Sequence, residues 1–331
     1  MSQSIIFGGN TYTGVAAVDF PKANSNDRAV FSDTSDANAA ASDIANGKTA
    51  YVNGSKVTGT ASGGGATEPY IEYTYGSGNS IYYAKMYGFS TIPRGAFAYC
   101  TDLLSVDISE CSPITKIEPY AFYGCSQLKF TIPDTVTEIG EYAFANCTAL
   151  DCTSLPSGLT TLGGHAFDSC TRLAISSLPS MLTEIPLYAF SGCSYITLSS
   201  LPSGITSIGN YAFRGCYRIT ISTLPSTISS VGNYAFRDCS GIQNLEIGCG
   251  SVGTYCFQYC TGLKKVWLRS SCTTISASTT SNCPFNGCST SLAIYAEPSS
   301  NPSGWGTYFN RTGSSGGTSV TVTYSQTTKP W

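Results

Sequence analysis

The stretch LPSGITSIGNYAFRGCYRITI, residues 201–221, decides the fold because its pattern recurs along most of the chain. Each copy holds a phenylalanine followed three residues later by a cysteine, and nine such pairs recur at intervals of 21 to 28 residues. This spacing is the signature of a solenoid, in which each repeat buries its apolar face against its neighbours. We therefore predict a buried column of each residue type. The columns comprise Phe97, Phe122, Phe144, Phe167, Phe190, Phe213, Phe236, Phe257 and Phe285, and Cys100, Cys125, Cys147, Cys170, Cys193, Cys216, Cys239, Cys260 and Cys288.

Within one copy the apolar residues form two short sets, which predict two parallel strands in each coil. Ile219 and Ile221 precede a Leu-Pro pair, and Ile205 and Ile208 end at a glycine. We expect the glycine at a corner with positive φ and the Leu-Pro pair at an irregular corner. The Tyr-Ala-Phe segment predicts a turn that points its phenylalanine inward. The predicted fold class is mainly β, a solenoid of about nine 23-residue coils over residues 89–294.

These elements resemble the BspA-type leucine-rich repeats of bacterial surface proteins. The resemblance rests on Ile-Gly, Ala-Phe and Cys elements that recur together, as in Ile208-Gly209, Ala212-Phe213 and Cys216. It implies an elongated, mildly curved scaffold that binds partners and performs no chemistry.

Composition narrows the function further. Only 11% of the 331 residues are charged and the net charge is −3, which argues against a nucleic-acid binder. Any histidine-based catalytic or metal site would have to use His165, the single histidine. The opening MSQSIIFGGN lacks the features of a secretory signal and no apolar run is long enough to span a membrane, so we expect neither Sec export nor membrane insertion. We predict no enzyme activity, no cofactor and no metal.

The cysteines raise the question of disulfides and zinc. Thiols in adjacent coils lie close together, but parallel side chains rarely reach a disulfide dihedral angle, so we expect buried free thiols. If a bridge forms, Cys272 with Cys283 is the expected pair. Six cysteines crowd into residues 249–288, but the absence of a CxxC pair there argues against zinc.

Residues 1–60 have a different composition and predict a small α+β module. Residues 5–12 and 13–20 predict short strands, and residues 36–45 predict a helix. Residues 48–60 predict a hairpin whose Asn-Gly turn is of type I′.

Short motifs in this module carry a second resemblance. Asp43-Ile44, Gly47-Lys48 and Tyr51-Val52-Asn53-Gly54 are similar to an N-terminal module of structural proteins of phages that infect Gram-positive bacteria, where it precedes unrelated binding domains. The resemblance implies that residues 1–60 attach the chain to other virion proteins.

Two segments are expected to cover the ends of the solenoid, which would otherwise expose apolar surface and unpaired strand edges. After a glycine-rich linker at residues 61–66, residues 67–88 alternate aromatic and polar residues and predict a capping hairpin. Residues 295–331, with Trp305 and Trp331 among them, are expected to cap the other end.

His165 lies two residues before Phe167, a position that holds tyrosine in most other copies. We therefore interpret His165 as a substitution within a stacked aromatic column and not as a catalytic residue. The column either stabilises the solenoid or offers a platform for sugar rings. Its tyrosines are Tyr120, Tyr142, Tyr188, Tyr211, Tyr234 and Tyr255.

The two positions between each Phe and Cys vary most, which indicates solvent and either a partner-binding surface or a plain solvated edge. Charge is also uneven, with a net −7 over residues 101–184 and a net +4 over residues 205–270. Aromatic, arginine and amide side chains at or near the varied positions are the candidate ligand contacts. They are Tyr123, Asn146, Arg214, Tyr217, Arg237 and Tyr259.

The leading hypothesis is a non-enzymatic protein displayed on a phage particle, where the solenoid recognises a bacterial surface glycan or protein. The alternative, a BspA-like adhesin of the bacterial cell surface, needs an export signal, whereas a virion leaves by lysis. A third hypothesis is a glycan depolymerase, which needs two carboxylates about 5 to 9.5 Å apart. Glu118, Glu141 and Glu184 are its candidates. A homo-oligomer is compatible with the sequence.

Overall fold

The computed structural model describes residues 69–331 except 77–79, 280 and 313–317. In residues 1–68 it describes the backbone of six short strands. Among these described residues, no helix has the length and apolar character that a membrane crossing requires.

The chain forms two compact units. One consists of residues 1–72 together with 86–88, and the other consists of residues 73–85 together with 89–331. The solenoid lies in the second unit, and each unit is described by itself below.

The first unit contains three antiparallel strand pairs. They are β1 (Ser4–Phe7) with β2 (Asn10–Thr13), β3 (Phe20–Pro21) with β4 (Arg28–Ala29), and β5 (Thr49–Val52) with β6 (Ser55–Thr58). The last pair confirms the predicted hairpin at residues 48–60. The strand boundaries predicted within residues 5–20 were wrong. The predicted strand of residues 5–12 is divided between β1 and β2, which pair with each other as a hairpin. The predicted helix and the type I′ turn lie outside the described residues.

A hairpin precedes the first coil, as predicted. Its strands β7 (Tyr70–Tyr75) and β8 (Ile81–Tyr87) form a sheet with β10 (Ser105–Glu110), in the order β10-β8-β7. The ring of Tyr73 packs edge-on against the ring of Phe97, with the centroids 6.4 Å apart. The first phenylalanine of the column is thus covered by an aromatic side chain of the hairpin.

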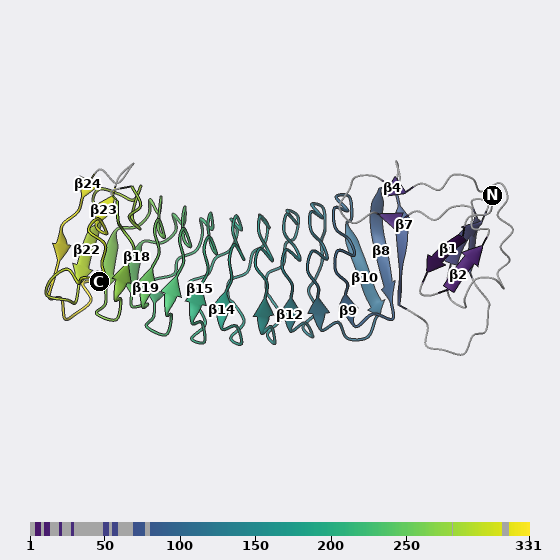
Figure 1. Ribbon diagram of the computed structural model, residues 1–331, viewed down its shortest axis with the longest axis horizontal. Coiled ribbons are helices and arrows are strands. Elements are labelled where there is room, and N and C mark those ends of the chain that lie inside the picture. Colours follow the sequence, from purple (N-terminus) through teal and green to yellow (C-terminus); the bar gives the residue numbers. More distant parts are fainter. Residues whose placement is uncertain are drawn as a thin grey trace. The chain divides into compact units, whose positions relative to one another are not determined.

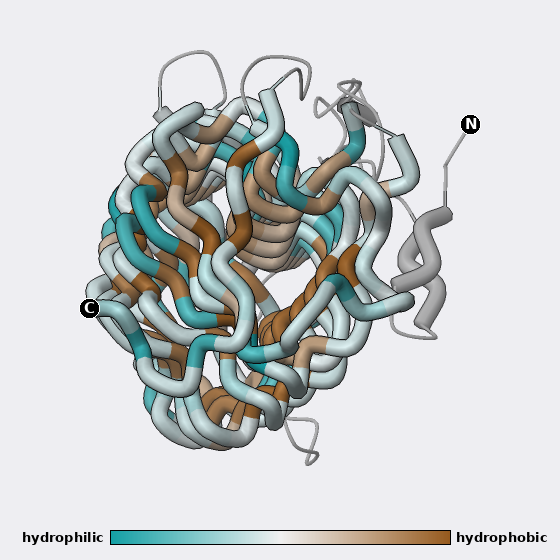
Figure 2. The backbone as a smooth tube through the Cα atoms, turned by 90° about the vertical axis from the view of Figure 1, so that its left-hand side faces the viewer, coloured by the Kyte–Doolittle hydropathy of each residue, from teal (hydrophilic) through white to brown (hydrophobic). Residues whose placement is uncertain are grey.

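The core of the second unit is a stack of the nine column phenylalanines. Neighbouring rings lie 5.1 to 5.8 Å apart and within 14° of parallel, and every one of these side chains is buried. Figure 1 shows the coils following one another along one axis, and Figure 2, viewed along that axis, shows the hydrophobic columns superimposed inside the coils. The predicted solenoid is confirmed.

Two-residue parallel strands, each ending in a buried aliphatic residue, run along one side of the coils. Proline divides them into two sheets. Gly163 and Gly209 each donate a backbone N–H to the preceding coil at 2.7 to 2.8 Å, but Pro186 holds the equivalent position between them and has no N–H. One sheet contains β9 (Thr91–Ile92), β11 (Lys116–Ile117), β12 (Glu138–Ile139) and β13 (Thr161–Leu162), and the other contains β14 (Glu184–Ile185), β15 (Ser207–Ile208), β17 (Ser230–Val231), β19 (Ser251–Val252) and β21 (Thr274–Ile275).

The strand predicted after each column cysteine is present in the first coil, as β10, and in the later coils, but no strand is described there in the coils between them. Gly248 and Arg269 donate their N–H groups to the preceding coil and extend the ladder, whereas Pro202 and Pro225 cannot do so at the same position. The prediction of two strands in every coil was therefore wrong, although the Leu-Pro pair is an irregular corner, as expected. This sheet consists of β16 (Thr223–Leu224), β18 (Asn244–Ile247), β20 (Lys265–Leu268), β22 (Ala293–Ala296) and β25 (Val322–Thr323).

The glycine that follows the first strand serves close packing and not a positive φ. A Cβ atom on Gly209 would lie 2.5 Å from the backbone nitrogen of Leu187, and one on Gly163 would lie 2.3 Å from that of Glu141. Neither glycine has a positive φ, so the predicted corner was wrong. Adjacent coils approach too closely at this point for a side chain.

The last coil is covered by residues 297–331. Trp305 is buried, pairs with Ile275 in an isolated bridge, and donates its Nε1–H to the carbonyl of Cys272 at 2.7 Å. Phe309 packs edge-on against it. A short antiparallel pair, β23 (Arg311–Thr312) with β24 (Thr318–Ser319), follows in this segment.

Candidate functional site

Eight of the nine coils bend through two left-handed residues, two positions before and two positions after the buried phenylalanine, and the coil of Phe285 has only the second of them. In one coil these are Tyr211, with φ of 57°, and Gly215, with φ of 72°. Between them the N–H groups alternate in direction. Phe213 and Gly215 donate to carbonyls of the next coil at 2.8 Å, whereas Arg214 and Cys216 donate to carbonyls three residues back. The predicted turn is therefore confirmed, and it joins adjacent coils.

This geometry corrects the interpretation of the two varied positions. The position two after Phe has positive φ, which explains why it holds Gly, Asn, Asp or Ser in most coils. The position directly after Phe folds back toward the residue three positions earlier. We expected this position to face solvent, and this was wrong for four side chains. The buried ones are Ala145, Ser191, Gln258 and Asn286.

The column cysteines fill the core and also donate hydrogen bonds. The thiol of Cys193 donates to the carbonyl of Phe167 in the preceding coil at 3.0 Å, and that carbonyl also accepts the N–H of Cys170. Burial raises the pKa of the Cys193 thiol well above its usual range. Cys100, in the first coil, is only partly buried, unlike the rest of the column. The same donation is made by Cys125, Cys147, Cys170, Cys216, Cys239, Cys260 and Cys288.

The structure pairs the remaining thiols differently from the expected bridge. Cys283 donates to the carbonyl of Arg311 at 3.0 Å. Cys272 instead lies beside Cys249, one coil away, and a thiol–thiol hydrogen bond and burial raise the pKa of Cys249. Sequence spacing missed this pair because both residues lie on corners whose register depends on coil length.

The predicted aromatic column is a continuous ladder. From Tyr120 to Tyr255 seven rings, including His165, stack with centroids 4.3 to 5.0 Å apart and planes within 13° of parallel. His165 lies between Tyr142 and Tyr188, and its Nδ1 is 3.0 Å from Asp168. Each interior ring has neighbouring rings over both faces. This arrangement favours the stabilising interpretation over a sugar platform, which needs exposed ring faces.

Two of the predicted ligand contacts lie in early coils. Tyr123 is half-buried, with its ring edge-on to those of Tyr99, Tyr120 and Tyr142. Asn146 is exposed, in the next coil, in a left-handed conformation.

The other four lie in later coils. Arg214 and Tyr217 are exposed. Arg237 is half-buried, with its guanidinium 5.8 Å from the ring of Tyr234 and 5.5 Å from that of Tyr259, which is exposed. The structure thus divides the six predicted residues into an early and a later group.

Sequence reasoning predicted Tyr217 but missed its neighbours Tyr195 and Arg218, which form a second exposed group with it. The guanidinium of Arg218 stacks on the ring of Tyr195 in the preceding coil, 4.2 Å from its centroid. Tyr195 and the neighbouring Tyr217 are each about half exposed. All three lie one or two positions after a column cysteine. The signal was available in the sequence, but attention to the positions between Phe and Cys overlooked it.

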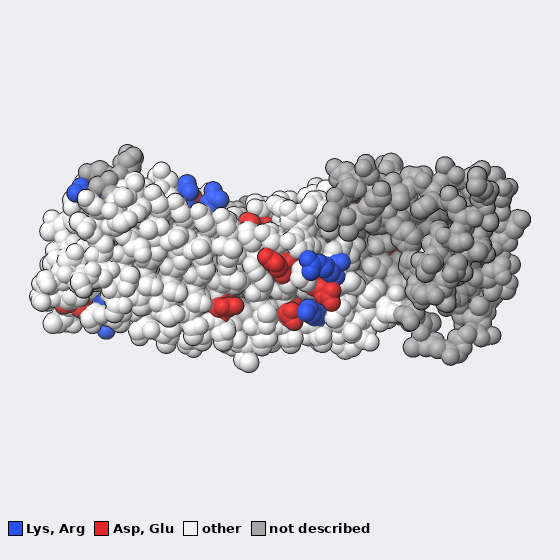
Figure 3. All heavy atoms as spheres, in the orientation of Figure 1, with Lys and Arg blue, Asp and Glu red and all other residues white. Residues whose placement is uncertain are grey.

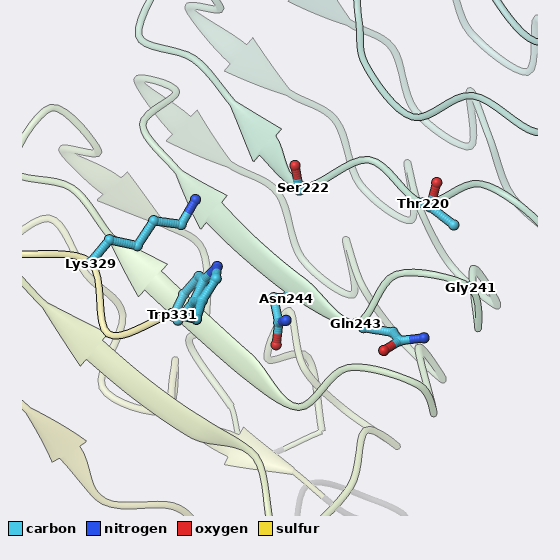
Figure 4. A pocket seen from close by; sticks show the side chains of 7 residues that line it. All are labelled: Thr220, Ser222, Gly241, Gln243, Asn244, Lys329 and Trp331. Atoms are coloured by element: carbon cyan, nitrogen blue, oxygen red, sulfur yellow. The ribbon is translucent and has the colours of Figure 1, made fainter.

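A pocket of about 320 Å³ was also missed. It lies where Thr220, Gln243 and Asn244 of two adjacent coils face Lys329 and Trp331 (Figure 4). Residues so far apart in sequence meet only because the chain after β25 returns across the sheet.

The carboxylates proposed for a depolymerase do not contact one another. Glu118 accepts the N–H of Arg94 at 2.9 Å, Glu141 and Glu184 are exposed, and within the described coils no hydrogen bond or ion pair joins the three. Asp134 and Asp151 share a more polar hollow of about 580 Å³. Where side chains are described, no group of three or more His, Cys, Asp or Glu residues is arranged to hold a metal ion.

A family model supports this geometry. The model, described as the BspA type leucine-rich repeat region, matches residues 90–200 and 183–291 in six copies, which together make up more than half of the chain. The chain belongs to the BspA-type leucine-rich repeat family. The matched residues of this BspA-type protein include every member of the phenylalanine stack.

Several solved structures are similar to this BspA-type chain. A leucine-rich repeat protein from Bacteroides ovatus is 20% identical, with a TM-score of 0.43 over 71% of this chain and 79% of the other. A leucine rich cell surface protein from Faecalibacterium prausnitzii is 23% identical, with a TM-score of 0.39 over 64% and 77%. A leucine rich repeat protein from T. pallidum is 22% identical, with a TM-score of 0.35 over 58% and 87%. No curated protein matches the chain significantly.

The BspA-type coils present a surface of hydroxyl, amide, aromatic and a few charged groups. Figure 3 shows that the charges visible on one face gather mainly in one mixed group and that most of the described surface there carries none. Such a surface suits recognition by stacking and hydrogen bonding.

Proposed function

We propose that this protein is a non-enzymatic recognition protein, which binds a bacterial surface glycan or protein through its solenoid and leaves that ligand unaltered. The observation that carries the proposal is the exposed aromatic and arginine group of the later coils, where Arg218 stacks on Tyr195 beside Tyr217. Large exposed aromatic rings and arginines anchor many binding surfaces because they offer contact area together with forked donors.

We place the protein at the surface of a bacterial cell. Family membership supports this location, since BspA-type repeats are found in bacterial surface proteins. A recognition surface built from repeats suits adhesion because every coil adds contact area.

The surface of a phage particle is the second candidate location. It is favoured by the motifs of residues 43–54 and by the hairpin of β5 and β6, which lies in the segment that carries the Tyr-Val-Asn-Gly motif. In that case residues 1–60 attach the chain to other virion proteins and the solenoid recognises the host.

The binding proposal is tested by retention of the full-length protein on bacterial cells. We expect Arg218→Ala and Tyr217→Ala each to reduce retention about tenfold, the loss typical of an interface anchor of about 1.4 kcal/mol. Met181→Ala is the matched control because Met181 is also an exposed, non-polar side chain of a coil. Retention unchanged in both test variants would overturn the proposed surface.

The location is tested by labelling the protein with a specific antibody. Label on the surface of intact producing cells supports the adhesin, whereas label that sediments with particles from a lysate supports the phage protein.

Glycan release from the same cells separates binding from depolymerisation. We expect none above background. Release that disappears in Glu118→Gln, Glu141→Gln, Glu184→Gln or Asp151→Asn would overturn the binding-only proposal.

A further inference from the structure

The pocket beside Trp331 is built from two adjacent coils and the chain that follows β25. Thr220 and Ser222 precede β16, and Gln243 and Asn244 lie at the start of β18 in the next coil. Figure 4 shows the Trp331 ring beside Asn244, with Gln243 further along the same coil. At about 320 Å³ the pocket lies at the lower end of the range of small-ligand sites.

Four polar side chains that line this pocket have no hydrogen-bond partner among the described residues. Some exposed hydroxyls of other coils are used internally: Thr206 donates to the carbonyl of Thr183 at 3.0 Å, and Ser229 donates to that of Thr206 at 2.9 Å. By contrast, the side chains of Thr220, Ser222, Gln243 and Asn244 make no hydrogen bond to any described part of the protein. Their donors and acceptors line the pocket without a protein partner and are available to a ligand.

An anchored aromatic ring forms one wall. The side chain of Trp331 is 36% exposed, and the ammonium groups of Lys329 and Lys265 lie 5.2 and 6.0 Å from its ring centroid. Lys329 is also paired with Glu246 of β18 at 3.1 Å. This ion pair holds residue 329 against the sheet and so positions the neighbouring Trp331 ring, which stays partly exposed.

The ammonium group that lines the site is already engaged in an ion pair. The ammonium of Lys329 is matched by the carboxylate of Glu246, which also pairs with Arg269 at 3.2 Å. The other polar walls are amides and hydroxyls. A ligand of this pocket therefore needs a face for stacking and several neutral hydrogen-bonding groups.

We propose that this pocket binds a neutral pyranose residue of a surface glycan. One face of a pyranose ring carries C–H groups that stack on tryptophan, and its hydroxyls both donate and accept, as the amides of Gln243 and Asn244 require. The inference rests on the proposed recognition function and adds a ligand class and a site on a different group of residues from Arg218 and Tyr217.

The test is calorimetric titration of the full-length protein with glucose, galactose and N-acetylglucosamine and their β-linked disaccharides, with glucuronate as the anionic arm. We expect at least one neutral sugar to bind with a millimolar or lower Kd. Trp331→Ala should weaken that binding at least tenfold and Gln243→Ala about threefold, while Tyr83→Ala, which removes an exposed aromatic side chain of β8, should leave it unchanged. Thermal unfolding of each variant controls for folding.

Failure of the pocket and failure of the recognition function give different results. No binding of any neutral sugar, binding of glucuronate alone, or undiminished binding in both Trp331→Ala and Gln243→Ala would overturn the pocket inference. Cell retention, measured on the same preparations, would then still report on the recognition function. Sugar binding without cell retention would instead support the pocket and overturn the wider role.

Discussion

At the residue scale, the stability of the coils depends on the Phe and Cys positions acting together. The carbonyl of Phe167 accepts the N–H of Cys170 from its own coil and the thiol of Cys193 from the next. Both of its acceptor sites are thus used within the buried core. This explains why a small apolar residue is not an equivalent substitute for cysteine here.

We predict that Phe190→Ala lowers the free energy of unfolding by about 3 to 5 kcal/mol, because the cavity it leaves cannot be filled by a rigid stack. The measurement is urea unfolding of the full chain. Met181→Ala, at an exposed position, should change the value by less than about 0.5 kcal/mol. A loss below about 1 kcal/mol for Phe190→Ala would contradict the buried column.

We also predict that stability falls at alkaline pH. Burial raises the pKa of column thiols such as Cys193 above the usual value of about 9. Below pH 9 both states keep their protons, but above it the unfolded chain ionises while the folded protein does not. Each such thiol then lowers the free energy of unfolding by up to about 1.4 kcal/mol per pH unit.

This pH dependence is checked by urea unfolding at pH 8, 9 and 10. Cys193→Ala should reduce the dependence of the free energy of unfolding on pH by the contribution of one thiol. The column thiols of the native protein should react with a labelling reagent only after denaturation. Equal slopes in the wild type and the variant would show that the column thiols are not protected.

At the scale of the element, glycine and proline decide where strands pair. Glycine allows the close approach of two coils after each short strand, as at Gly209, and it supplies a donor that Pro186 lacks. On the other side of the coils, the sheet of β16, β18, β20 and β22 begins where the Leu-Pro corners end. The number of strands in each sheet thus depends more on whether a backbone N–H is available at this position than on strand propensity.

We predict that Gly209→Ala destabilises the protein by at least about 2 kcal/mol, because the new Cβ would lie 2.5 Å from backbone atoms of the preceding coil and force the two apart. Gly158→Ala is the matched control. Its Cβ would meet nothing within 4 Å and its φ is not positive, so it should be neutral or stabilise by up to about 1 kcal/mol. Thermal unfolding distinguishes the two, and similar melting temperatures for both variants would contradict close coil packing.

At the scale of the whole molecule, a solenoid is stabilised by contacts between neighbouring coils and needs its ends covered. The aromatic contact of Tyr73 with Phe97 and the burial of Trp305 fill these roles. The second unit therefore holds its own core and its own end contacts.

We predict that residues 67–331, expressed without the N-terminal module, fold alone and keep cell binding. The melting temperature of this fragment should lie within about 3 °C of that of the solenoid transition of the full chain, followed by circular dichroism. Loss of cooperative unfolding in the fragment would show that the module is part of the folding unit. Residues 1–60 should be required only for attachment to a carrier.

The repeat interval alone determined the solenoid, its buried columns and the turn around each phenylalanine. These follow from local pattern, since every coil repeats the same burial and the same spacing. The aromatic ladder was predictable for the same reason, and so was the covered first coil.

Only the tertiary structure decided the use of individual groups. The thiol donors, the close approach at Gly209 and the interruption at Pro186 depend on how one coil sits on the next, which sequence spacing does not report. The pocket at Trp331 depends on a segment that crosses from β25 back to β18 and brings together side chains 83 or more residues apart. Local pattern cannot reveal such a contact, because its geometry is set by the returning chain and not by the repeat.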